Sequence, residues 1–347
     1  MQLRRIWDGA TLLVQLNAGQ GWIDVREILT RLSPQFPEDK IANWSSNLVA
    51  LLGATPGLRA DLAGAALELL PNTSRETGAV IIPFEPRSHR DFMLYERHAV
   101  DAARGFVRCF MPKFVPIVRT YEALTGRDFP KLKPRPLWYH QPVYYMGNHL
   151  AFVTDGADVA IPSYTRALDY ELELGFVISH SLFNASPEEG ESAIGGFVVL
   201  NDFSARDVQL EEMRSGFGPQ KAKHFATAIS NVVVTADEVL PSWHSLKGYV
   251  KINGHFVTET TSESPRWSLG EVLAHASRSE RLYPGEFFGT GTFPSGSGIE
   301  TGRFLSEGDT VEIGIYGVGS LTNRIVAEKG VENEGHRSVE ANSVQSQ

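Results

Sequence analysis

Two glutamates at alternate positions, Glu171 and Glu173, stand in an otherwise apolar segment that is typical of a β-strand. Because successive side chains of a strand point to opposite faces, both carboxylates share one face, whereas Leu172 and Leu174 share the other. Two adjacent carboxylates repel each other unless water or a cation lies between them. The segment is therefore either a strand with a hydrated acidic face or a strand that presents two ligands to a cation.

Asp202 is a third carboxylate that could join this pair. It follows the apolar run 196–200, which could form a strand beside the one that carries Glu171 and Glu173. Three carboxylates without a cluster of histidine or cysteine would select a hard divalent cation, Mg²⁺, Mn²⁺ or Ca²⁺. The alternative is that Asp202 serves only the turn after its strand, as Asn-Asp pairs often do.

Cationic and basic side chains flank these carboxylates in the sequence. Arg206 and Lys223 follow Asp202 and could hold an anionic substrate or stabilise an oxyanion, although either could simply be an exposed surface charge. His98 follows Asp91 by seven positions, which is two helical turns, so a helix would present both side chains to one site. The alternative for His98 is an exposed helical histidine.

The elements that must position these residues fall into three parts. Residues 1–85, with a strand at 11–16 and helices at 24–32 and 58–70, predict a small α+β N-terminal domain. Residues 86–328 predict a larger, catalytic domain that is mainly β, and residues 329–347 are polar and predict a disordered tail. We expect a strand at 79–84 that leads into the larger domain. Within that domain we expect helices at 92–108 and 269–278, and strands at 174–178, 195–200, 231–235, 249–252 and 310–315.

The composition excludes several functional classes. The formal net charge is −9 and no basic stripe occurs, so a nucleic-acid partner is not expected. No apolar stretch approaches the ~20 residues of a membrane helix, and the segment 1–8 lacks the apolar core of a signal peptide. The single cysteine, Cys109, forms no internal disulfide and suits the cytoplasm. We expect its thiol to be buried.

Five segments together resemble the fumarylacetoacetate hydrolase superfamily. They are Glu-Leu-Glu at 171–173, Asn-Asp-Phe-Ser-Ala-Arg-Asp-Val-Gln at 201–209, and Gly-Pro-Gln-Lys-Ala-Lys-His-Phe-Ala-Thr at 218–227. Arg-Asp-Phe-Met-Leu-Tyr-Glu-Arg-His at 90–98 and the glycine-rich segment 289–309 extend the match. The resemblance implies a mixed, rolled β-sandwich fold for the catalytic domain and an enzyme that forms homodimers.

The resemblance also implies roles for individual residues. Glu171, Glu173 and Asp202 match the metal ligands of the family, and Asp91 matches a further acidic ligand of its longer members. His98 matches the histidine that activates water. The carboxylate that orients this histidine is matched by Glu300, and the groups around the substrate oxyanion are matched by Arg206, Gln209 and Lys223.

The expected lining of the substrate pocket departs from that of the founding enzymes. Thr292 matches a substrate-contacting threonine, and Tyr139 is aligned with a substrate-contacting tyrosine. However, Met93 and Met213 stand where those enzymes place tyrosines, and Val107 stands where they place an arginine. The substrate is therefore expected to differ from fumarylacetoacetate.

The predicted function is metal-dependent hydrolysis of a carbon–carbon bond in a 1,3-dicarbonyl acid, an acylpyruvate-like or β-diketo acid, through a metal-bound enolate. The partner is thus a small-molecule oxo acid. One alternative is decarboxylation, isomerisation or dehydration of a 2-oxo acid on the same scaffold. A more distant alternative is a ligand-binding protein without catalysis, against which the three carboxylates argue because they are costly to bury without a cation.

Overall fold

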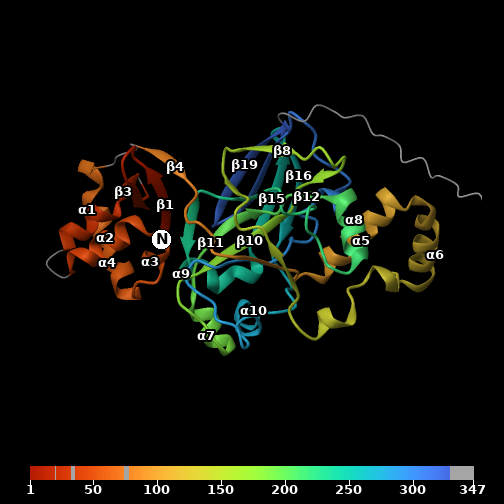
Figure 1. Ribbon diagram of the computed structural model, residues 1–347, viewed down its shortest axis with the longest axis horizontal. Helices are drawn as coiled ribbons and strands as arrows, with labels where there is room; N and C mark the ends of the chain where they lie inside the picture. The colour runs from red at the N-terminus through yellow and green to blue at the C-terminus, as the bar shows by residue number, and fades with distance from the viewer. Residues whose placement is uncertain (20, 33–35, 74–77, 329–347) are drawn as a thin grey trace, which may run out of the picture.

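The computed structural model describes residues 1–19, 21–32, 36–73 and 78–328 of the chain (Figure 1). Strands from all parts of the described chain meet in a large mixed sheet at the centre, and helices lie at both ends of it (Figure 1). The structure is α+β with several mixed sheets, which confirms the fold class expected from the sequence. The predicted tail at 329–347 lies outside the described residues.

The central sheet brings the N-terminal strands and the catalytic strands into one surface. Its main path runs β3-β2-β1-β14-β11-β10-β17-β5-β6, and β4, β13 and β7 pair at its sides. These strands are β1 (Gln2–Trp7), β2 (Leu12–Asn17), β3 (Trp22–Asp24), β4 (Ala79–Ile81), β5 (His89–Phe92), β6 (Tyr144–Gly147), β7 (Phe152–Thr154), β10 (Leu172–Ile178), β11 (Ile194–Asn201), β13 (Thr227–Ile229), β14 (Val232–Thr235) and β17 (Phe287–Gly289).

A second sheet of five strands packs against the first. Its order is β16 (His255–Thr261), β15 (Lys247–Ile252), β18 (Thr310–Ile315), β19 (Gly319–Ala327) and β8 (Asp158–Ile161). The short strands β9 (Leu168–Asp169) and β12 (Ser204–Ala205) form a separate pair.

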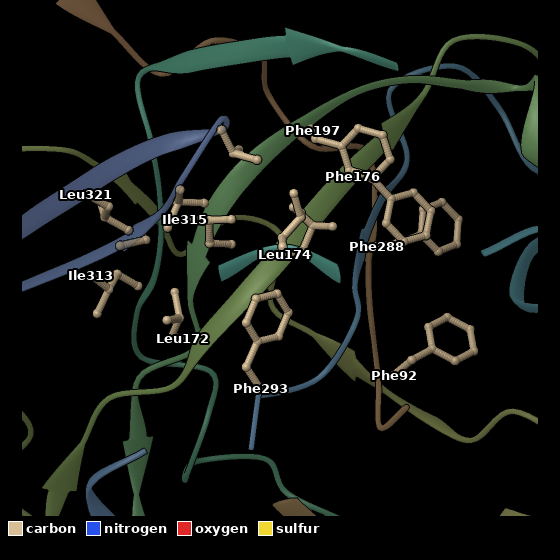
Figure 2. Close-up of a cluster of buried hydrophobic side chains, with 14 of the residues drawn as sticks. Phe92, Leu172, Leu174, Phe176, Phe197, Phe288, Phe293, Ile313, Ile315 and Leu321 are labelled. Carbon is tan, nitrogen blue, oxygen red and sulfur yellow. The ribbon is translucent and has the colours of Figure 1, made fainter. Parts of the chain in front are cut away.

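The main core lies between the two sheets, and β10 contributes one full face to it. Leu172, Leu174 and Phe176 alternate along β10 and point into this core, where Ile313 and Ile315 of β18 meet them (Figure 2). The opposite face of β10 carries Glu173 and Val177, and Val177 belongs to a second core shared with the N-terminal elements. Glu173 is therefore buried because its strand is covered on both sides.

Helices cover the sheet at both ends. In the N-terminal part these are α1 (Val25–Leu32), α2 (Glu38–Ser46), α3 (Leu48–Leu52) and α4 (Pro56–Thr73), and farther along the chain α5 (Glu96–Phe110), α6 (Val115–Thr125), α7 (Pro187–Ser192), α8 (Arg206–Ser215), α9 (Ala236–Val239), α10 (Leu269–Ala276) and α11 (Gly298–Thr301). Short 3-10 helices occur at η1 (Pro112–Phe114), η2 (Pro130–Leu132), η3 (Pro136–Tyr139) and η4 (Leu240–Ser245). Among the helices that the structure describes, none has the length and apolar character needed to cross a bilayer.

The N-terminal part is joined to the rest through the sheet. β1 pairs antiparallel with β14, which in turn pairs with β11. The boundary at residue 85 stays a prediction.

Two local expectations from the sequence are wrong. The helix expected from residue 92 begins at Glu96, and residues 89–92 form β5, because pairing with β17 and β6 outweighs the helical pattern of the segment. Asp91 and His98 therefore do not share a helix. Cys109 is exposed, because the buried face of α5 ends at Gly105 and the last turn extends past the core.

Candidate active site

Three buried carboxylates, from three different strands, meet at one point of the central sheet. Asp91 lies on β5, Glu173 on β10, and Asp202 directly after β11. One oxygen of each lies within 4.8 Å of one oxygen of each of the others, and all three residues are at most 5% exposed. The arrangement follows from strand order, because β10 pairs with β11 on one side and with β17 on the other, and β17 pairs with β5.

Gly289 on β17 makes this convergence possible. It pairs with Gly175 of β10 and with Asp91 of β5. A Cβ atom at this position would lie 2.2 Å from Oδ1 of Asp91 and 2.9 Å from Oε2 of Glu173. Any side chain larger than that of glycine would therefore push the two carboxylates apart.

The charges of this cluster fit a divalent cation. Burial raises the pKa of Asp91 well above its ordinary value, and repulsion from Glu173 and Asp202 raises it further. Burial raises the pKa of Glu173 as well, and the charges of Asp202 and Glu171 add to the effect. Within the described residues, Oδ1 of Asp91 and Oδ1 of Asp202 have no hydrogen-bond partner. An all-oxygen, anionic and incompletely paired set of this kind suits Mg²⁺, Mn²⁺ or Ca²⁺.

Glu171 lies beside the cluster, but it is paired with two cations. Nη2 of Arg206 donates to Oε1 of Glu171 at 2.6 Å, and the ammonium of Lys223 contacts both Glu171 and Asp202. Burial opposes ionisation of Glu171, but the charges of Arg206 and Lys223 outweigh it and lower its pKa. The compact group of potential ligands contains three of the four expected residues, Asp91, Glu173 and Asp202, and the role of Glu171 as a ligand stays a prediction.

His98 forms a pair with Glu300 at the edge of the carboxylates. Nδ1 of His98 lies 2.9 Å from Oε2 of Glu300, and Nε2 of His98 lies 3.7 Å from Oε1 of Glu171. Burial lowers the pKa of His98, but the charge of Glu300 and its hydrogen bond outweigh burial, so that the pKa is raised. Glu300 is itself fixed by the amide of Ser295 at 2.9 Å and the hydroxyl of Ser297 at 2.7 Å. A histidine held in this way has one defined tautomer.

Asp169 connects this pair to Arg206, and the sequence did not predict its role. Its carboxylate accepts hydrogen bonds from Nε of Arg206 at 2.7 Å and from the amides of Gly298 and Ile299 at 2.7 and 2.8 Å. These amides begin α11, which carries Glu300. One fully buried carboxylate therefore sets the position of both Arg206 and the partner of His98.

A cavity of ≈ 590 Å³ opens over the carboxylates. Its inner part includes Asp91, Glu171 and Glu173 together with Lys223 and Thr292, and the hydroxyl of Thr292 donates to Glu173 at 3.2 Å. The expected residues Gln209, Met93 and Met213 also line it. Arg206 and His98 contact Glu171 and are not among the described residues that line the cavity.

Tyr139 and Val107 are not brought to this cavity. The hydroxyl of Tyr139, at the end of η3, donates to Glu96 at 2.5 Å, and Val107 packs beside the small cluster under α6. The tyrosines that line the cavity are instead Tyr144 and Tyr145 on β6, and the hydroxyl of Tyr145 donates to Asp202 at 2.7 Å. The register of β6 beside β5 places Tyr145 opposite Asp91, and no pattern in the sequence indicates this pairing.

The model for the C-terminal domain of fumarylacetoacetate hydrolase matches residues 120–326. The chain belongs to the fumarylacetoacetate hydrolase family. This confirms the resemblance, and the matched range includes Glu173, Asp202 and Glu300 but begins after Asp91 and His98.

Relatives of the family support the same assignment. The human mitochondrial oxaloacetate tautomerase FAHD1 is 30% identical over 185 residues, which are 53% of this chain and 81% of that protein. The fumarylacetoacetate hydrolase of Exiguobacterium antarcticum has the same fold, with a TM-score of 0.65 at 19% identity over 94% of this chain and 100% of that one. The fumarylpyruvate hydrolase of Pseudomonas aeruginosa, solved with Mn²⁺ and pyruvate, has a TM-score of 0.54 at 21% identity over 73% of this chain and 94% of that one.

Proposed function

We propose that this protein is a divalent-metal-dependent hydrolase that cleaves a carbon–carbon bond in a 1,3-dicarbonyl acid of the acylpyruvate or β-diketo type. The observation that carries the proposal is the buried His98–Glu300 pair, 2.9 Å between Nδ1 and Oε2, beside the three buried carboxylates. A base held in one tautomer is needed for activating water, and an anionic cluster is needed for a hard cation.

A divalent cation held by Asp91, Glu173 and Asp202, with Glu171 as a further predicted ligand, would polarise a carbonyl group of the substrate and stabilise negative charge on it. Mg²⁺ is the predicted ion, and Mn²⁺ or Ca²⁺ are the alternatives. The fumarylpyruvate hydrolase that shares the fold was solved with Mn²⁺, which supports a divalent ion of this kind.

The proton transfers are assigned to the chain's own residues. Glu300 accepts from Nδ1 of His98 and leaves Nε2, on the side of Glu171, free to take a proton from water. The hydroxide bonds to the carbonyl carbon, the bond from that carbon to its neighbour breaks, and the neighbour takes up a proton, so that one water is consumed. Lys223 and Gln209 line the cavity and can donate to the developing oxyanion, and Arg206 holds Gln209 through a hydrogen bond of 2.9 Å.

A second candidate is tautomerisation or decarboxylation of a 2-oxo acid on the same site. The human relative that shares 30% identity is named an oxaloacetate tautomerase, which favours this candidate. Neither of these reactions needs an activated water, so the His98–Glu300 pair argues for hydrolysis.

A panel of 2,4-dioxo acids and oxaloacetate, with Mg²⁺ or Mn²⁺, distinguishes the two. We expect loss of the ultraviolet absorbance of the enol together with the appearance of two shorter acids from the 2,4-dioxo acids. Loss of enol absorbance from oxaloacetate without cleavage of any 2,4-dioxo acid would instead identify a tautomerase. Association of the protein into a homodimer stays a prediction, which sedimentation of the purified protein can test.

A further inference from the structure

The cavity changes in character from its inner end to its opening. At the inner end lie the carboxylates and Lys223, whereas the part nearer to solvent is lined by Met93, Val143, Tyr144, Met146, Met213 and Phe217. Four of these side chains are well exposed although they are apolar: Met213 is 54% exposed, Phe217 86%, Met146 50% and Met93 38%. They come from β5 and its connection to α5, from β6, from α8 and from the loop after α8. Three separate stretches of the chain, the last of which runs from α8 into the loop after it, therefore supply one apolar collar around the opening.

The collar offers no partner for a second negative charge. Among the described residues that line the cavity, Lys223 is the only lysine or arginine, and its ammonium already contacts Glu171 and Asp202. His224 also lines the cavity, and its Nε2 lies 2.9 Å from the carbonyl oxygen of Met146. Arg214, the residue after Met213, pairs with Glu211 at 2.6 Å. A carboxylate held in the collar would therefore lose water without gaining a cation.

We infer that the substrate of this site is a 2-oxo acid whose far end is an apolar acyl chain or an aromatic ring, and that the collar binds this end. This inference rests on the proposed function, since the carboxylates and the cation they would hold must bind the polar end. The apolar end then lies against Met93, Met146, Met213 and Phe217, and unbranched, flexible methionine side chains adapt to chains of different length.

The inference predicts how binding changes with the substrate. Each methylene added to the acyl end should tighten binding about four-fold until the collar is filled, which is the transfer free energy of a methylene expressed as a ratio. A substrate of equal length that ends in a carboxylate should bind at least ten times more weakly than one that ends in a methyl group, because its charge is desolvated without a partner.

The test compares two 2,4-dioxo acids of equal chain length, one ending in a methyl group and one in a carboxylate. Their binding to the Mg²⁺-loaded protein is measured by calorimetry, and their cleavage is measured by product analysis. The diagnostic variant is Met213→Arg, which puts a cation into the collar from an exposed position on α8. The matched control is Leu150→Arg, which adds the same charge at a residue that is 82% exposed and does not line the cavity.

Wild-type protein should prefer the methyl-ended acid, Met213→Arg should reduce this preference about five-fold, and Leu150→Arg should leave it unchanged. Equal or tighter binding of the carboxylate-ended acid to the wild type would overturn the inference, whichever of the two acids is cleaved. Tighter binding of the methyl-ended acid without any cleavage would uphold the inference and overturn hydrolysis as the function. Failure of both acids to bind would overturn both.

Discussion

Replacing His98 with alanine removes the base but leaves every carboxylate of the cluster in place. The contact of His98 with the cluster is a single approach of 3.7 Å to Glu171, and the three closest potential ligands are Asp91, Glu173 and Asp202. We therefore expect His98→Ala to bind Mn²⁺ with nearly the affinity of the wild type. Loss of a general base typically costs about 10²- to 10⁴-fold in rate, so hydrolysis should fall by that factor.

Glu300→Gln should also lower the rate of hydrolysis, but by less than His98→Ala. The carbonyl oxygen of the glutamine can still accept from the amide of Ser295, and this orients its NH₂ group toward His98. Nδ1 of His98 must then accept, and the proton moves to Nε2, which can no longer receive one from water. A hydrogen bond worth about 1 kcal/mol favours this wrong tautomer, so we expect a loss of roughly 5-fold.

Three quantities are measured on the wild type, His98→Ala and Glu300→Gln: Mn²⁺ affinity by calorimetry, cleavage of a 2,4-dioxo acid, and decarboxylation of oxaloacetate. Any decarboxylation should persist in both variants, because it requires no activated water. Wild-type hydrolysis in His98→Ala would refute the assignment of His98 as the base. Loss of Mn²⁺ binding in that variant would mean that His98 is a ligand.

Two further predictions concern the support of the site and the stability of the fold. Gly105→Ala should lower both Tm and hydrolysis, since its Cβ would lie 2.2 Å from the carbonyl oxygen of Ile299 on α11; Gly64→Ala, also in a helix but with no atom within 4 Å of the new Cβ, should raise Tm slightly. Glu122→Gln should destabilise the protein by about 1 kcal/mol at pH 7 in urea unfolding, because the hydrogen bond from Arg104 lowers the pKa of Glu122 below 4.5. The lowered pKa contributes stability that is fully present above 4.5 and is lost as the pH falls through the lower pKa of the folded state, so the difference from the wild type should shrink on acidification. A difference that stays undiminished at the lowest pH at which the protein remains folded would contradict this reasoning.

The sequence predicts the carboxylates on the two adjacent strands better than any other part of the site. The alternation of Glu171 and Glu173 with Leu172 and Leu174 can be read from neighbouring residues alone. It predicts a strand, and β10 forms there. The apolar run before Asp202 is equally local, and it forms the antiparallel neighbour of β10. When the chain reverses between two such runs, the start of the first strand lies beside the end of the second, which brings Asp202 near the glutamates.

The position of Asp91 could not be predicted in the same way. β5 is a short strand that pairs parallel with β17, and these two strands are far apart in the sequence. Parallel pairing leaves no trace in the periodicity of a four-residue segment, so the helical pattern of the following residues was extended too far. Asp91 lies on a strand and His98 on a helix, so the seven-residue spacing of a shared helix does not position them.

The roles of Tyr145 and Asp169 could not be predicted either, because both depend on contacts between residues far apart in the sequence. Asp169 acts through amides of Gly298 and Ile299, which only the folded chain brings near. Tyr145 reaches Asp202 because β6 lies at the end of the sheet beside β5. Their residue types alone distinguish neither of them from other aspartates and tyrosines in the chain, including Tyr139.

Metal dependence of hydrolysis tests the central claim most directly. Purified protein is stripped with a chelator, its metal content is measured, and cleavage of a 2,4-dioxo acid is followed while Mn²⁺ or Mg²⁺ is added back. We predict that the stripped protein is inactive, that one ion per chain restores cleavage, and that Glu173→Gln and Asp202→Asn bind the ion much more weakly. Full cleavage by metal-free protein, with both carboxylate variants as active as the wild type, would contradict the account.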